Sequence, residues 1–243
     1  GMRGDFEGAP ASLAPFDHAI AYVPSMNLYL DGTAEFTGSR ELPAMDRGAL
    51  ALRIHEGKPE LVHLPEPPPE ESVTSRKVEA VVGQDGSATI DFRADVTGVH
   101  APSWRSRYHS ASTQKKRVQE DLGAEYPGLE LTDVKSNDLE KVEDPVSLRA
   151  KGKVSQLAKR DGDTLTLAAG PREHMVREYA TLSQRKRDMR IFSLTAEESD
   201  TTLKLPAGAK VVSAPRAQKG DSPFGSYAVE ADVKGAEVRT KTR

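Results

Sequence analysis

The stretch VEAVVGQDGSATIDF, residues 78–92, decides the fold class that this sequence predicts. Two β-prone runs flank residues 84–86, and an Asp-Gly pair between such runs is a strong signal for a β-hairpin. The same pattern returns at residues 160–163, before another β-prone run. Repeated short strands with few helices favour a mainly β (α+β) architecture, in which we expect a β-sandwich.

The same region contains further predicted strands and one inserted helix. The helix covers residues 112–122, with Ser or Thr near its start and Gly123 as its C-cap. Its apolar face is thin, so packing on a sheet has to stabilise it. The additional strands are expected at residues 201–205, 210–213, 227–233 and 237–242.

Two predicted hairpins precede this region. The first has a turn at Pro24-Ser25, and the second has a Glu-Gly-Lys-Pro turn between residues 49–55 and 60–64. The Pro-rich run 65–71 has few backbone donors and favours an extended conformation, so we place the main domain boundary there. The predicted units are residues 1–45 with the first hairpin, 46–72 with the second hairpin and the linker, and 73–243 with the sandwich.

The composition excludes several classes of protein. Hydrophobic residues make up 37% and aromatic residues 5% of the chain, which predicts a thin core. The formal net charge of -3 argues against a polyanion-binding protein driven by bulk charge. No apolar stretch reaches the roughly 18 residues of a membrane span. The sequence contains no cysteine, which excludes disulfides, thiolate-held metals and a cysteine nucleophile.

The sharpest candidate for chemistry is the pair His18 and Asp31. If the first hairpin turns at Pro24-Ser25, His18 lies opposite Asp31, and Ile20 lies opposite Tyr29. Directly opposed Cβ atoms are about 4.5–5.5 Å apart, so the carboxylate can fix the tautomer of the imidazole. The imidazole then serves as the base for a nucleophile. The alternative is a polar cross-strand pair at the edge of a sheet.

A second pair of histidines gives a weaker signal. His55 and His63 could face each other across the second hairpin. A metal needs about three or four ligands, and only Glu56 and Glu60 lie nearby, so we expect no metal site.

Basic and aromatic residues are interleaved at residues 104–109, and further basic clusters lie at 115–117 and 185–187. Such interleaving suits single-stranded nucleic acid. Because the chain is acidic overall, we interpret these residues instead as the end of a strand and the solvated face of a helix. We therefore expect no nucleic-acid partner. Since the sequence has no phosphate-binding glycine loop, we expect no nucleotide. No other cofactor is expected either.

The run Phe16-Asp17-His18-Ala19-Ile20, followed by Tyr29-Leu30-Asp31-Gly32-Thr33-Ala34, resembles bacterial transglutaminase-like proteins with a cysteine-protease-like core. In that family a nucleophilic cysteine comes first, then an aromatic-polar-His strand, then a Leu-Asp-x-Thr strand. The resemblance implies that His18 is the general base and Asp31 its orienting acid. Residues 117–131, as a helix, Pro-Gly turn and strand, and residues 222–227, as a turn, also resemble the family.

The family's cysteine and the helix that bears it would precede residue 1. The resemblance therefore implies the C-terminal piece of such a protein: incomplete core strands, then a β-rich domain of unknown function. We expect a chain that is not itself an enzyme and acts as an accessory or protein-interaction domain. One alternative is the C-terminal part of an active cysteine transglutaminase or protease whose nucleophile lies upstream. Another is a carbohydrate- or cell-wall-binding module that uses Trp104 and Tyr108 for stacking.

Loss of the helices that cover the core strands would expose Ile20, Tyr22 and Tyr29. Large exposed apolar patches usually mark contacts, so we expect this face to dock on the sandwich or on a second copy of the chain. The expected partner is a protein or peptide, with no insertion into a membrane. The resemblance implies a periplasmic or otherwise exported protein; residues 1–30 show no signal-peptide pattern, and a cytoplasmic location stays open.

Overall fold

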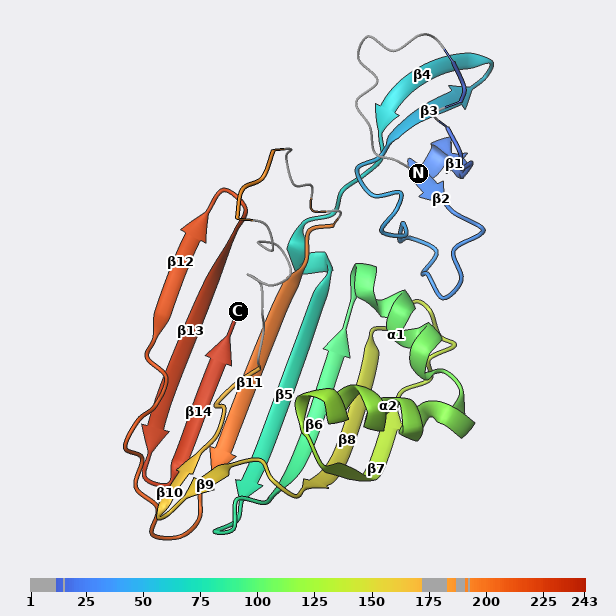
Figure 1. The fold of residues 1–243 in the computed structure, drawn as a ribbon. Helices are drawn as coiled ribbons and strands as arrows, with labels where there is room; N and C mark the ends of the chain where they lie inside the picture. The colour runs from blue at the N-terminus through green and yellow to red at the C-terminus, as the bar shows by residue number, and fades with distance from the viewer. Residues whose placement is uncertain (1–11, 15, 172–182, 187–190, 192) are drawn as a thin grey trace.

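A mixed sheet of eight strands dominates the computed structural model, which describes residues 12–14, 16–171, 183–186, 191 and 193–243 (Figure 1). Its strands are β5 (Val73–Val82), β6 (Ala88–Val96), β7 (Leu129–Ser136), β8 (Val146–Val154), β11 (Ala196–Lys204), β12 (Gln218–Ser222), β13 (Gly225–Lys234) and β14 (Glu237–Thr242). Their order across the sheet is β12-β13-β14-β11-β5-β6-β8-β7. Neighbouring strands are antiparallel except β11 and β5, which run parallel.

Helices cover one face of the sheet, over β6, β8 and β7 (Figure 1). A short 3-10 turn, η3 (Gly98–His100), leads into α1 (Ala101–Tyr108), and α2 (Ala111–Glu125) packs on β7. Every second residue of β6 is buried, because alternate side chains of a strand point to the same face. The buried residues of β6 from Ile90 to Val96 belong to the main core, together with Val118 and Leu122 of α2. Among the described residues, no helix combines the length and the apolar character that crossing a bilayer requires.

The opposite face of the sheet carries charges. Asp91 of β6 pairs with Lys151 of β8 (2.9 Å), and Arg93 pairs with Asp95 (2.6 Å). A second sheet could pack there only by removing these charges from water. The mainly β class that the sequence predicts is confirmed. Within it, the eight strands belong to one sheet rather than to the two sheets of a sandwich. The described residues contain a second helix, α1, beside the one predicted at residues 112–122.

Local predictions within this region vary in their outcome. The hairpin at residues 78–92 is confirmed as β5 and β6, and the one around 160–163 as β9 (Lys159–Asp161) and β10 (Thr164–Thr166). The predicted helix lies within α2, but Gly123 is inside that helix rather than at its C-cap. Residues 210–213 form no strand, so that prediction is wrong. Of the basic cluster 185–187, residue 187 lies outside the described residues.

Residues 16–71, which we call the N-terminal unit, contain two separate hairpins. The first joins β1 (Ala21–Val23) to β2 (Leu28–Leu30) through the 3-10 turn η1 (Pro24–Met26). The second joins β3 (Leu50–His55) to β4 (Lys58–His63). Another 3-10 turn, η2 (Pro69–Glu71), leads from this unit toward β5.

A small hydrophobic cluster holds the two hairpins together. Tyr29, Leu42 and Leu64 are buried in it, and Ile20 and Tyr22 pack against them. The expectation that Tyr29 is exposed for docking is therefore wrong, because residues 42–64 of the same chain cover it. Ile20 and Tyr22 are half-buried by the same contacts.

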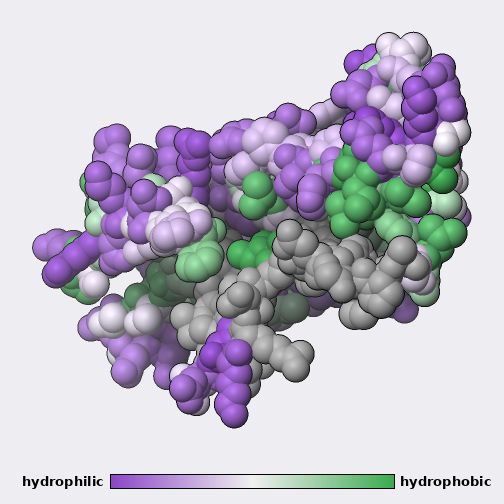
Figure 2. Space-filling model, turned by 90° about the horizontal axis from the view of Figure 1, so that it is seen from above, coloured by the Kyte–Doolittle hydropathy of each residue, from purple (hydrophilic) through white to green (hydrophobic). Residues whose placement is uncertain are grey.

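Buried arginines tie the N-terminal unit to the rest of the chain. Arg47 is 2% exposed and donates from Nη1 to Ser72 Oγ (2.8 Å), directly before β5. Arg105 of α1, also 2% exposed, donates to the carbonyl oxygens of Phe36 (2.8 Å) and Asp144 (2.6 Å). Burial lowers the pKa of both guanidinium groups. The unit thus docks at the end of the sheet where α1 lies (Figure 1). In the view from above, hydrophobic residues gather mainly on the right-hand side (Figure 2).

Asp121 connects α2 to α1 through a contact that depends on pH. It accepts hydrogen bonds from the Arg107 guanidinium and from the Tyr108 hydroxyl (2.6 Å). Burial raises the pKa of Asp121, but these hydrogen bonds outweigh burial and hold it below its ordinary value. Stability from a depressed pKa is present above the unfolded-state value of about 4 and is lost as the pH falls through the lower folded-state value.

We therefore expect Asp121→Asn to lower the free energy of unfolding at neutral pH by only about 1 kcal/mol, because the pair is partly exposed. The loss should be smaller at an acidic pH at which Asp121 is protonated in the folded protein. Urea unfolding of both proteins at the two pH values measures this difference. Asp133→Asn, which removes an exposed pair with Lys135, is the matched control and should change little. An Asp121→Asn effect that is the same at both pH values would contradict the assignment.

Candidate functional site

The first hairpin brings His18 and Asp31 together. Nε2 of His18 lies 3.0 Å from Oδ2 of Asp31, and the two side chains are 30% and 2% exposed. The register of β1 and β2 differs by two residues from the predicted one, since Tyr22 lies opposite Tyr29 and the loop extends to Asn27. A two-residue shift leaves each side chain on its face of the hairpin. The predicted contact between His18 and Asp31 is therefore present although the predicted register was wrong.

Thr33 fixes the Asp31 carboxylate. Its backbone N–H (2.9 Å) and its hydroxyl (2.7 Å) donate to Oδ1 of Asp31, which leaves Oδ2 for His18. Burial raises the pKa of Asp31, but the hydrogen bonds from Thr33 and His18 outweigh burial and hold it below its ordinary value. An ionised Asp31 favours the His18 tautomer with its proton on Nε2. Nδ1 of His18 has no hydrogen-bond partner among the described residues.

Asp46 completes a cluster that the sequence analysis did not predict. One carboxylate oxygen of Asp46 lies within 4.8 Å of both a ring nitrogen of His18 and a carboxylate oxygen of Asp31. Asp46 is 7% exposed, and its Oδ2 has no hydrogen-bond partner in the described part of the chain. Burial raises the pKa of Asp46, and the negative charge of Asp31 raises it further. The site thus holds two closely spaced carboxyl groups beside one imidazole.

A tight turn positions Asp46. Its N–H donates to the carbonyl oxygen of Pro43 (2.9 Å), and its own carbonyl oxygen accepts from the N–H of Ala49 (3.0 Å). Arg47 donates from Nε to the carbonyl oxygen of Leu42 (2.8 Å), so the turn is anchored to the small hydrophobic cluster. The proline and the glycine in residues 43–48 indicate a turn in the sequence. They do not indicate what that turn packs against, so they do not place Asp46 beside His18.

The second hairpin does not form the histidine pair considered as a metal site. His55 lies opposite Lys58, next to the turn, whereas His63 lies opposite Leu50 at the other end of the hairpin. The ring of His55 stands edge-on to that of Tyr22, with centroids 6.4 Å apart. This histidine therefore contributes to the packing of one hairpin on the other.

The interleaved aromatic and basic residues at 104–109 lie in and directly after α1 rather than at the end of a strand. Arg105 and Tyr108 are buried, and Trp104 packs against the core with its ring 5.5 Å from that of Tyr108. Tyr108 is therefore not accessible for stacking on a base or a sugar.

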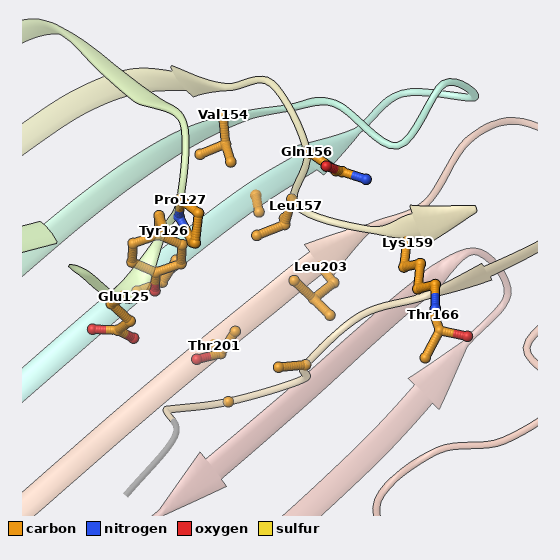
Figure 3. A pocket seen from close by; sticks show the side chains of 14 residues that line it. Glu125, Tyr126, Pro127, Val154, Gln156, Leu157, Lys159, Thr166, Thr201 and Leu203 are labelled. Carbon is orange, nitrogen blue, oxygen red and sulfur yellow. The ribbon is translucent and has the colours of Figure 1, made fainter. Parts of the chain in front are cut away.

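A cavity of about 300 Å³ lies on the covered face of the sheet (Figure 3). It is bounded by β5, β11, the C-terminal end of α2 and residues 154–170. Its lining is largely apolar, with Glu125, Lys159 and Thr201 among the polar groups. Burial, followed by the charge of Glu125, raises the pKa of Tyr126, so its hydroxyl stays neutral. Since its described lining includes no histidine, the His18 cluster is the better candidate for acid–base chemistry.

Fold and site define a mainly β chain that carries a hydrogen-bonded histidine–aspartate pair in a small unit beside a large sheet. The model of a family described as a domain of unknown function, DUF3858, matches residues 163–243. No curated protein and no solved structure matches the chain. An uncharacterised β-rich domain is thus confirmed for the C-terminal region, which includes β10 to β14 but not the His18 cluster. The link to transglutaminase-like proteins stays a prediction.

Proposed function

We propose that this chain is a non-catalytic fragment or homologue of a transglutaminase-like protein and acts as an accessory or protein-interaction domain. The observation that supports this proposal is the 3.0 Å hydrogen bond between His18 and Asp31 in a chain that has no cysteine. Two members of a Cys-His-Asp triad are arranged for base catalysis, but this chain does not supply the thiol.

Each atom of the pair has a role in this proposal. Asp31, held by Thr33, accepts a hydrogen bond from Nε2–H of His18 and would stabilise the imidazolium ion. Nδ1 is then the nitrogen that takes a proton from a nucleophile. Because the His18 side chain is 30% exposed, another segment or another protein can approach it.

A second candidate function is that of an active cysteine transglutaminase or protease in which a longer polypeptide provides the nucleophile. The specific observation that favours it is Nδ1 of His18, which has no hydrogen-bond partner among the described residues and is therefore available to take a proton from a thiol. A carbohydrate-binding role has less support, since Tyr108 is buried.

The purified chain tests the first proposal directly. It is incubated with a glutamine-containing peptide plus a fluorescent amine, and separately with fluorogenic peptides, and we expect no turnover above that of buffer. Asp31→Asn is compared with His63→Ala, which removes an exposed histidine of the same unit. Turnover that Asp31→Asn abolishes and His63→Ala preserves would overturn the proposal.

A longer gene product that includes upstream sequence tests the second candidate. Amide-bond chemistry that requires both an upstream cysteine and His18 would establish that function in place of the first. Inactivity of a folded longer product that contains such a cysteine would rule the second candidate out.

A further inference from the structure

Three separate segments of the N-terminal unit converge on one point. His18 precedes β1, Asp31 follows β2, and Asp46 lies in the turn before β3. Each offers one nitrogen or oxygen atom, and these atoms all lie within 4.8 Å of one another. The sequence spacing of these residues forms no recognised metal motif, so only the fold reveals the cluster.

Asp46 lacks a hydrogen-bond donor for one carboxylate oxygen, and either a proton shared with Asp31 or a bound cation would satisfy it. The residue is 7% exposed, and its Oδ2 is inaccessible to solvent and accepts no hydrogen bond from the described residues. A buried carboxylate oxygen without a partner is strongly unfavourable. Asp31 cannot supply a donor when it is ionised, because its oxygens are also acceptors and are already engaged by Thr33 and His18.

The ligand set selects the kind of cation. One imidazole nitrogen with two carboxylate oxygens suits a first-row divalent cation such as Zn²⁺ better than Mg²⁺ or Ca²⁺, which prefer oxygen ligands alone. Two ligands that are each about 2.0–2.2 Å from zinc are at most about 4.4 Å apart, so shifts of a few tenths of an ångström close the cluster around the ion. Thr33 orients Asp31 from behind, as groups outside the ligand shell commonly do.

We propose that His18, Asp31 and Asp46 bind one divalent cation of the zinc class. The partly exposed side of His18 is the entry path and leaves a fourth position for water. The ion binds Nε2, which faces Asp31, so the proton leaves that nitrogen and the neutral ring carries its proton on Nδ1. This inference needs neither a cysteine nor turnover and is therefore independent of the proposed function. A bound ion would also compete with the use of His18 as a base.

Calorimetric titration of the chelator-treated chain with Zn²⁺ tests the proposal. We expect one ion per chain, and Asp46→Asn and His18→Gln should weaken binding by more than the about 10- to 100-fold loss typical of changes outside the ligand shell. Glu35→Gln, an exposed acid of the same unit, and His55→Ala, an exposed histidine, are the matched controls and should bind zinc like the unmodified chain. Mg²⁺ should bind more weakly than Zn²⁺.

Nitrogen-15 NMR of the His18 ring gives a readout that a merely structural role would not change. Zinc should move the ring proton from Nε2 to Nδ1, which alters both nitrogen shifts, while His55 and His63 stay unchanged. If Asp46→Asn fails to fold, His18→Gln decides the question, because His18 is partly exposed and outside the hydrophobic cluster. The proposal is overturned if the unmodified chain binds no zinc, or if only His55→Ala weakens binding. In either case a proton shared by the carboxyl groups of Asp31 and Asp46 would account for the cluster.

Discussion

Replacing Arg105 with alanine should lower the free energy of unfolding by about 3 kcal/mol. Arg105 is a large buried side chain at 2% exposure, and alanine would leave a cavity in its place. The substitution also removes the hydrogen bonds to the carbonyl oxygens of Phe36 (2.8 Å) and Asp144 (2.6 Å). Phe36 has a φ of +60°, an unusual conformation for a bulky residue, and the bond from Arg105 helps to hold it.

Two further variants separate packing from hydrogen bonding at this position. Arg105→Met keeps most of the side-chain volume and should recover about half of the loss. Arg93→Met removes an exposed pair with Asp95 and is the control for loss of an arginine charge, with an expected change below about 1 kcal/mol.

Urea unfolding measures these differences, and hydrogen exchange of residues 36–41 locates them. Exchange should accelerate in this segment, because Arg105 of α1 and the hydrogen bond from the Ser39 N–H to Glu143 (2.8 Å), in the loop between β7 and β8, hold it in place. A loss for Arg105→Ala no larger than that for Arg93→Met would show that the buried arginine does not tie the two parts together.

The parts of the fold that the sequence predicted are those set by neighbouring residues. The hairpin of β5 and β6 depends on an Asp-Gly turn between alternating runs, so both its position and its pairing could be predicted. The parallel pairing of β5 with β11 joins strands far apart in the chain, and no local pattern distinguishes it from the pairing of a second sheet. For that reason the sequence predicts a sandwich where the structure has a single sheet.

The candidate site follows the same division. The contact of His18 with Asp31 could be predicted, because an even shift in register leaves both side chains on the same face. The sequence does not predict the burial of Asp46, Arg47 and Arg105. Charged residues are usually exposed, and only tertiary packing buries these three.

Replacing Gly98 with alanine should cost about 3 kcal/mol or more, because the new methyl group would meet backbone atoms. Its Cβ would lie 2.3 Å from the carbonyl oxygen of Glu71, 2.4 Å from Ser72 Oγ and 2.8 Å from Ser72 Cα. Ser72 is fully buried and accepts hydrogen bonds from Arg47 (2.8 Å) and from the N–H of Val99 (3.2 Å). It therefore cannot move away without breaking the junction between the N-terminal unit and the sheet.

Gly235→Ala is the matched control for this prediction. Gly235 has the same φ of +60° in the turn between β13 and β14, but an added Cβ there would meet nothing within 4 Å. Its substitution should cost only the backbone strain of about 1–2 kcal/mol, and the difference between the two variants isolates the close approach at Ser72. The carbonyl oxygen of Ser72 also accepts a hydrogen bond from the N–H of Ala196 (3.0 Å). Gly98→Ala should therefore accelerate hydrogen exchange at the start of β11 as well as in β5. Equal losses for the two glycines, with β11 unaffected, would show that backbone conformation alone fixes glycine at position 98.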